Sequence, residues 1–346
     1  MISRVLVIHP GGLGDVLLAL PAIRALRAAF EGSDIVLIAA SGIGTLLKVC
    51  SEIHSLISLE RGGLSGLLSD DSDPPEWLRH QLIRTELAVC WMRDMDGRLA
   101  RSLRTVGVRE VIVESPFQTM NPLQHQSDRF LASVKTITGS TEKVGPLRLP
   151  IELMDQGKGL LEALGMSEGR PVVLHPGSGS RHKCADPSLF VQAARSLSAA
   201  GYQPLVVGGP ADDDQVSAVQ AQISELAPSV TGLELLPMAG LLAHARLFIG
   251  HDSGLTHLAA TLHRPTVSIF GPTSAERWAS RGGHVAIMSA EACRCDGWEA
   301  VEACREKRCL RVPEKHLLEM CETLLRCDCD AVNQRGNRPR RLVQPR

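Results

Sequence analysis

One short pattern occurs twice in the sequence and limits the folds that the chain can adopt. Residues 5–14 read VLVIHPGGLG and residues 172–180 read VVLHPGSGS. Each begins with an apolar run typical of a buried strand and continues through His-Pro-Gly into small residues, as where a parallel strand ends at a ligand-binding loop. His-Pro-Gly is a common turn composition, but the matching strand context favours two similar α/β halves that each open with a strand and a glycine loop.

Further apolar runs of the same kind alternate with helical segments. The runs expected to be strands are residues 5–8, 35–38, 172–174, 204–207, 247–249 and 266–270. Short apolar strands separated by helices are typical of parallel sheets covered on both faces. This pattern predicts an α/β fold with parallel sheets.

The length of 346 residues corresponds to about two domains. We place the first domain at residues 1–150, because residues 145–150 form a Pro-bearing extended stretch. The second domain spans residues 151–330 and is expected to open with a helix over residues 152–165 that ends at a glycine. Residues 331–346 are a basic tail without acidic residues; we expect it to be flexible and solvated, although such a tail could also contact an anionic membrane surface.

The charge balance excludes several classes of function. Lys plus Arg total 37 and Asp plus Glu total 38, for a net charge of -1, and aromatic residues are 3% with one Tyr. Without a basic excess or many stacking residues, we expect no nucleic-acid partner. No uncharged stretch approaches the roughly 18 apolar residues of a membrane span, and the N-terminal apolar run lacks a cleavage signal, so a cytoplasmic protein is expected.

The first glycine loop contains Gly11, Gly12 and Gly14 and ends at Asp15. It matches neither G-x-G-x-x-G nor a Walker A sequence, and no acid follows the second expected strand, which disfavours a nicotinamide dinucleotide. The Asp15 carboxylate has two interpretations. It caps the following helix, or it points into the ligand cleft because Pro21 distorts the start of that helix.

Two later loops carry phosphate-binding chemistry. Residues 178–183 combine hydroxyls, backbone amides and one Lys charge, which suits a phosphate, although a plain polar surface loop has the same composition. Residues 247–260 predict a strand, a turn and a helix start, whose free amides favour an anion. The candidate phosphate-binding residues of the two loops are Ser178, Ser180, Lys183, Asp252, Ser253, Gly254, Thr256 and His257.

Several of these candidate phosphate-binding residues also have a purely structural interpretation. Asp252 or Ser253 is expected to cap the helix, and His257 could be an ordinary surface residue rather than a diphosphate contact. A fourth strand-end loop reaches Asp212, which could accept hydrogen bonds from a ribose or belong to an acidic helix start. Glycine loops at strand ends in both halves predict one nucleotide diphosphate bound in a cleft.

Seven of the ten cysteines lie between residues 293 and 329. Four thiolates can hold zinc, and the candidates for a structural zinc site are Cys293, Cys295, Cys304 and Cys309. Their spacing differs from that of a zinc ribbon, and three more cysteines follow at positions 321, 327 and 329. Reduced cysteines that only pack are the alternative.

Four segments are recognisable together: residues 11–21 (GGLGDVLLALP), 175–180 (HPGSGS), 250–260 (GHDSGLTHLAA) and 270–273 (FGPT). They resemble glycosyltransferase family 9, the heptosyltransferase-like enzymes of lipopolysaccharide core assembly, and the resemblance covers residues 4–325. It implies a GT-B architecture of two Rossmann-like domains facing a central cleft, with the acceptor on the N-terminal domain and the nucleotide sugar on the C-terminal domain. It also implies inverting, metal-independent transfer of a heptose from ADP-L-glycero-D-manno-heptose to a core oligosaccharide, with no cofactor required.

The resemblance also implies roles for individual residues. Asp15 matches the family's general base, and Lys183 with a loop serine matches a donor-phosphate contact. The residues that match the diphosphate loop are Asp252, Ser253, Gly254 and His257. Many relatives carry Trp-Pro after the loop lysine, where residues 184–187 of this chain read CADP, so the surroundings of the nucleotide base differ.

The implied partners are a nucleotide sugar and a lipid-linked glycan acceptor, met at the inner face of the inner membrane. Acidic groups on that acceptor could contact Arg93, Arg98 and Arg129, although exposed arginines are commonly just solvated. Two other functions stay open: a nucleotide-sugar 2-epimerase-like isomerase of the same architecture, and a non-catalytic nucleotide-binding module.

Overall fold

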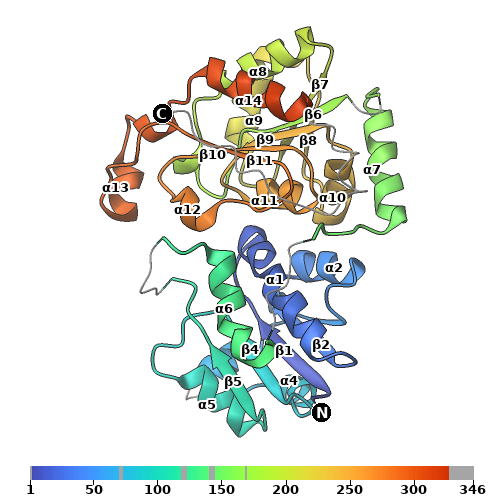
Figure 1. The fold of residues 1–346 in the computed structure, drawn as a ribbon, viewed down its shortest axis with the longest axis vertical. Coiled ribbons are helices and arrows are strands. Elements are labelled where there is room, and N and C mark those ends of the chain that lie inside the picture. The colour runs from blue at the N-terminus through green and yellow to red at the C-terminus, as the bar shows by residue number, and fades with distance from the viewer. Residues whose placement is uncertain (1, 70–72, 118–122, 140–144, 168–169, 327–346) are drawn as a thin grey trace. The chain divides into compact units, whose positions relative to one another are not determined.

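The computed structural model describes residues 2–69, 73–117, 123–139, 145–167 and 170–326. The basic tail and cysteines 327 and 329 therefore lie outside the described residues. The chain divides into two compact units, Met1–Val144 and Gly145–Arg346 (Figure 1). The division falls where the extended stretch 145–150 begins. None of the helices in the described ranges is long and apolar enough to cross a membrane.

The first unit contains a sheet of five parallel strands in the order β3-β2-β1-β4-β5. Its central strand is β1 (Arg4–Ile8), whose last four residues are buried on both faces, which explains the continuous apolar run in the sequence. The other strands are β2 (Asp34–Ala39), β3 (Ser55–Ser58), β4 (Leu87–Cys90) and β5 (Glu110–Val113). The helices are α1 (Leu13–Ala29), α2 (Ser41–Val49), α3 (Leu64–Leu68), α4 (Glu76–Leu82), α5 (Arg98–Thr105) and α6 (Gln126–Thr138), with a 3-10 turn η1 (Leu59–Arg61).

The second unit contains a sheet of six parallel strands in the order β11-β10-β9-β6-β7-β8. The strands are β6 (Pro171–His175), β7 (Gln203–Gly208), β8 (Ser229–Thr231), β9 (Leu247–His251), β10 (Thr266–Phe270) and β11 (Val285–Ser289). The longer helices are α7 (Ile151–Ala163), α8 (Ser188–Ala199), α9 (Asp213–Ile223), α10 (Leu235–Ala243), α11 (Gly254–Thr261) and α14 (Glu314–Arg326). The shorter ones are η2 (Arg181–Lys183), α12 (Ala275–Trp278), α13 (Gly297–Ala303) and η3 (Arg308–Leu310).

The predicted parallel α/β architecture is confirmed, and all six predicted strands are present. Five further strands were not predicted. Four of them, β3, β5, β8 and β11, are the sheet edges, where several residues are partly exposed. The strands β3 and β8 lack a continuous apolar run, whereas β5 and β11 contain one, at residues 111–113 and 285–288. The fifth, β4, is a buried apolar run of four residues, like the strands that were predicted.

In both sheets the strand order reverses beside the first strand of the unit. β1 lies between β2 and β4, and β6 lies between β7 and β9. Open parallel sheets bind ligands outside the carboxyl ends of the strands at such a reversal. The two copies of the His-Pro-Gly pattern follow β1 and β6, so the sequence repeat marks this position in each unit.

In the second unit, helices α7 and α10 approach each other at a pair of glycines. A Cβ added to Gly157 would lie 2.0 Å from the carbonyl carbon of Gly240, and a Cβ added to Gly240 would lie 2.2 Å from the carbonyl oxygen of Leu153. The two backbones are therefore in direct contact, and no side chain fits between them.

This contact makes Gly157→Ala destabilising. We expect it to lower the free energy of unfolding by about 1–3 kcal/mol, because the added methyl group overpacks the contact. Gly159→Ala, in the same helix, is the matched control, since a Cβ there meets nothing within 4 Å. Alanine's better helix propensity should raise the stability of that variant by about 0.5–1 kcal/mol. Urea denaturation measures both, and equal unfolding free energies would contradict the close approach.

Candidate functional site

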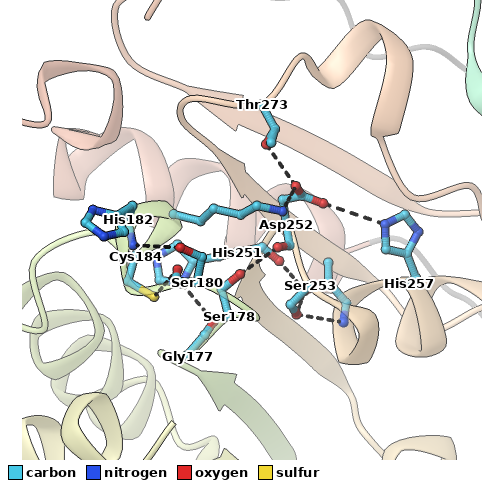
Figure 2. A network of polar contacts seen from close by, with 12 residues as sticks. Gly177, Ser178, Ser180, His182, Cys184, His251, Asp252, Ser253, His257 and Thr273 are labelled. Carbon is cyan, nitrogen blue, oxygen red and sulfur yellow. Dashed lines mark hydrogen bonds and ion pairs between the residues drawn. The ribbon is translucent and has the colours of Figure 1, made fainter. Parts of the chain in front are cut away.

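The loops that follow β6 and β9 lie side by side at the carboxyl edge of the second sheet (Figure 2). The two strands are neighbours, with His175 opposite Gly250 in their register. Ser178 joins the loops, because its hydroxyl donates to the backbone oxygen of Asp252 at 2.8 Å. The structure therefore brings the second and third predicted loops together.

Asp252 is the centre of a group of polar side chains (Figure 2). Its Oδ2 accepts from Lys183 Nζ and from the Thr273 hydroxyl, both at 2.8 Å, and its Oδ1 lies 3.7 Å from His257 Nε2. Burial alone would raise the pKa of Asp252, but the neighbouring His257 and the charge of Lys183 outweigh it and hold that pKa well below its usual value. The carboxylate is therefore ionised and keeps Lys183 beside it.

The first turn of α11 is held by Ser253. This residue is the N-cap, and its Oγ accepts from the backbone N–H of Thr256 at 3.4 Å. Of the two capping candidates, Ser253 therefore caps the helix, while Asp252 pairs with Lys183. Gly254 is the first residue of α11. Thr256 is fully buried and its hydroxyl donates to the backbone oxygen of His251, so this side chain shapes the turn itself.

Asp212 lies in the loop between β7 and α9 and is 6% exposed. Its Oδ2 accepts from the N–H of Gly209 at 2.7 Å and lies 2.9 Å from Nε2 of His175. Asp212 is also the N-cap of α9, whose first turn carries Asp213 and Asp214, so the predicted acidic helix start is confirmed. Its carboxylate bonds inside the protein. Sequence reasoning missed His175 as a site residue; the signal was its place in the repeated His-Pro-Gly pattern.

The 3-10 turn η2 shapes the second loop. Ser180 is its N-cap and its Oγ accepts from the N–H of His182 at 3.3 Å, so Ser180 supports the turn from which Lys183 extends. Lys307, from a distant segment, donates to the backbone oxygens of Arg181 at 2.9 Å and Cys184 at 3.3 Å. The loop is therefore fixed at both ends of η2.

In the first unit, Asp15 lies in the first turn of α1 and its Oδ2 accepts from the N–H of Gly12 at 3.1 Å. The N-cap of α1 is therefore Gly12, and Asp15 supports that cap from the third position of the helix rather than being the N-cap itself. The expectation that Pro21 distorts this turn is wrong, because the N–H that Pro21 lacks would bond to the carbonyl of residue 17, well inside the helix. Gly11 is required here, since a Cβ would lie 2.7 Å from the ring of His9 and 2.9 Å from Cβ of Asp15. Gly14 belongs to the first turn of α1.

Arg129 does not present its charge to a ligand. It is 6% exposed, and its guanidinium donates to Glu114 at 3.0 Å, to the backbone oxygen of Ser115 at 3.1 Å and to that of Pro116 at 2.9 Å. Arg98 donates to the backbone oxygen of Leu68 at 3.2 Å. Both arginines therefore tie loops of the first unit together.

The cysteine cluster lines a cavity of about 280 Å³ in the second unit, with Cys293, Cys295, Cys304 and Cys309 all present as free thiols. The neighbouring Cys293 thiol raises the pKa of Cys295, and burial raises that of Cys309. Within the described ranges, no three His, Cys, Asp or Glu side chains are arranged to hold a metal ion. The zinc prediction therefore finds no support in this part of the chain.

Two buried histidines are neutral in the folded protein. Burial lowers the pKa of His9 and that of His251 to about 4 each. Nδ1 of His9 accepts from the N–H of Gly11 at 3.1 Å, and Nε2 of His251 accepts from the N–H of Ala185 at 2.9 Å. Protonating either ring would break one of these bonds.

These pKa values predict a loss of stability in mild acid. The unfolded chain takes up protons at His9 and His251 near pH 6.5, but the folded chain does so only near pH 4. The free energy of unfolding should therefore fall as the pH drops from 6.5 towards 4, by about 1.4 kcal/mol per pH unit for each histidine. Urea denaturation across this range measures the slope. Replacing the exposed His316 with Gln should leave the slope unchanged, and a flat profile in the wild type would contradict the assignment.

Residues 122–309 match the family model of glycosyltransferase family 9 (heptosyltransferase). Lipopolysaccharide heptosyltransferase 3 of Escherichia coli is 32% identical over 171 residues, which are 48% of this chain and 46% of that relative. The match thus spans about half the length of this curated relative.

Solved structures share the fold over nearly the whole chain. A glycosyltransferase family 9 protein from Veillonella parvula DSM 2008 has a TM-score of 0.77 at 21% identity and covers 94% of this chain and 97% of its own. ADP-heptose lipopolysaccharide heptosyltransferase II of E. coli has a TM-score of 0.72 at 18% identity. It covers 93% of this chain and 98% of its own. At these identities the likeness shows the fold, and it confirms the predicted GT-B class with two Rossmann-like units.

Proposed function

Because the chain belongs to glycosyltransferase family 9, the heptosyltransferase family, we propose that it transfers a heptose or a related sugar from ADP-heptose to a lipopolysaccharide core or related glycan. The E. coli relatives described above carry the names of lipopolysaccharide heptosyltransferases, one of them with ADP-heptose as part of its name. The observation that carries the proposal is the placement of Lys183 and ionised Asp252 beside the N-terminus of α11.

In this proposal the second unit binds the diphosphate of the donor. Lys183 has three N–H donors, and its bond to Asp252 uses one, which leaves two for phosphate oxygens. The first amides of α11 have no partner within the helix, and the helix dipole adds partial positive charge there. Cation and amides together suit a diphosphate, and Thr273 helps Asp252 to hold Lys183 in place.

Asp15 is the proposed general base for an inverting displacement. The acceptor hydroxyl attacks the anomeric carbon, its proton passes to the carboxylate of Asp15, and the bond from that carbon to the diphosphate oxygen breaks. Lys183 and the amides of α11 stabilise the charge that develops on the leaving diphosphate. Because these donors supply the positive charge, the proposal includes transfer without a metal ion.

The proposal also places the protein in the cytoplasm, with its acceptor at the inner face of the inner membrane. Lipopolysaccharide is lipid-linked, so an enzyme that modifies its core works near a membrane surface. The Arg-rich residues 333–346 support a peripheral contact, since basic segments are attracted to anionic lipids.

Asp15→Asn tests the base. We expect transfer from ADP-heptose to fall by about 10²–10⁴-fold, because asparagine does not accept the hydroxyl proton, while asparagine still supports the cap of α1 and keeps the fold. ADP affinity, measured by calorimetry, should be unchanged. Glu31→Gln, an exposed carboxylate beyond α1, is the matched control and should retain full activity. Running the assay with the wild-type protein in EDTA tests whether transfer needs a metal ion. Full activity in EDTA supports metal-independent transfer.

Other outcomes of this assay would replace the proposal. Undiminished transfer by Asp15→Asn removes Asp15 as the base. Mass spectrometry that finds the donor sugar isomerised without an acceptor favours the epimerase-like alternative. A wild type that binds ADP but never releases it from a sugar donor favours a non-catalytic nucleotide-binding module.

Lys183→Met tests the diphosphate contact. The substitution keeps an unbranched stem of similar length but removes the charge, so ADP binding should weaken by about tenfold or more. Lys315→Met, at a lysine whose side chain is 85% exposed, is the matched control and should bind ADP as the wild type does. Equal affinities for the two variants, measured by calorimetry, would show that Lys183 does not contact the donor.

A further inference from the structure

We infer that His175 is a positioning residue that fixes Ser253 at the start of α11 for the donor diphosphate, an inference that rests on the function proposed above. His175 ends β6 and is 2% exposed. Its Nδ1 lies 3.2 Å from Oγ of Ser253, and its Nε2 lies 2.9 Å from Oδ2 of Asp212. One buried ring thus joins the β7–α9 loop to the helix start that follows β9.

Asp212 determines how the ring is oriented. Burial raises the pKa of Asp212, but the hydrogen bond from His175 and the N–H of Gly209 outweigh it, and the pKa lies below its usual value. An ionised carboxylate can only accept, so Nε2 of His175 carries the proton that points to it. In the neutral ring, Nδ1 is then an acceptor aimed at the hydroxyl of Ser253.

The neighbours of Ser253 determine which hydrogen bonds its hydroxyl accepts and which it donates. Its oxygen accepts from the N–H of Thr256, and this hydrogen bond makes Ser253 the N-cap of α11. The Thr256 hydroxyl donates to the backbone oxygen of His251, so in its 3.0 Å contact with Ser253 it is the acceptor. The Ser253 hydroxyl therefore donates its hydrogen either to Nδ1 of His175 or to the hydroxyl of Thr256. These contacts hold the Ser253 side chain in one rotamer.

His251 makes the reciprocal contact from the end of β9. Its Nδ1 lies 3.2 Å from the backbone oxygen of Gly177, and its Nε2 accepts from the N–H of Ala185 at 2.9 Å. The histidine at the end of each strand therefore binds the loop that follows the other strand. With both rings buried, the two loops are held in one relative position.

This arrangement matters for the donor because backbone amides bind phosphate well only when they are already oriented. If Ser253 is released, the first turn of α11 frays, and ordering it on binding costs affinity. His175 would touch no phosphate in this account. It acts through Ser253, and Asp212 acts through His175.

Two substitutions of His175 test its two ring nitrogens separately. His175→Gln places an amide near the position of Nε2, towards Asp212, and leaves no atom in the place of Nδ1. His175→Asn places its amide nearer to Nδ1, towards Ser253. We expect His175→Gln to weaken ADP binding about tenfold in calorimetry, with a smaller loss for His175→Asn, since one hydrogen bond to the cap is lost. The KM for the donor should rise while the KM for the acceptor stays constant.

A double-mutant cycle with Ser253→Ala tests whether His175 affects ADP binding through Ser253. If His175 acts through Ser253, His175→Gln adds no further loss once Ser253 is alanine. Additive losses overturn the inference, and so does unchanged affinity in His175→Gln. A merely structural role would lower the melting temperature and the folded fraction but leave the affinity of the folded fraction unchanged, which also overturns it. His316→Gln, an exposed histidine in the same unit, is the control.

Asp212→Asn provides the same test if neither His175 variant folds. It keeps the shape of the carboxyl group but weakens the bond to His175, so ADP binding should weaken only while Ser253 is present. A wild type that does not bind ADP overturns the proposed donor and this inference together. A wild type that binds ADP, with additive losses in the cycle, overturns only the role of His175.

Discussion

The pairing of β6 with β9 is the constraint on which the candidate donor site depends. These strands are distant in sequence but adjacent and parallel, so their carboxyl ends bring two loops to one edge of the sheet. Neither loop forms the site alone: one supplies Lys183, and the other supplies Asp252 and the amides of α11. A parallel sheet whose strand order reverses at this point provides that adjacency without any special loop sequence.

The candidate site contains two buried carboxylates, those of Asp212 and Asp252, and each needs partners that stabilise its charge. A buried charge is tolerated only when it is paired and hydrogen-bonded. Asp252 has Lys183 and Thr273, and Asp212 has His175 and the N–H of Gly209, and in each case these partners lower the pKa against the effect of burial. Removing one partner would leave the other side of the pair unsatisfied, so both groups are sensitive to single substitutions.

The sequence allowed prediction of features that depend on neighbours along the chain. Continuous apolar runs identify central strands, and small or capping residues identify the loops, including the Ser253 cap. The partners of His175 could not be predicted, because Asp212 and Ser253 are 37 and 78 residues away and meet it only through the strand order. The edge strands β3 and β8 were missed because polar positions break the apolar run.

The repeated His-Pro-Gly pattern shows how one local sequence serves two purposes. In the first unit, His9 accepts from Gly11 in its own loop, and its ring packs edgewise against those of Trp91 and Phe130, with centroids 5.9 and 5.3 Å away. In the second unit, a carboxylate and a hydroxyl from two other loops take the places beside the histidine. The difference lies in the neighbouring strand: the residues after β2 include no acid, whereas the loop after β7 supplies Asp212. A histidine that supports its own loop suits the first unit, where one carboxylate is proposed as the base, and a histidine that links separate loops suits the proposed diphosphate site, which several loops assemble.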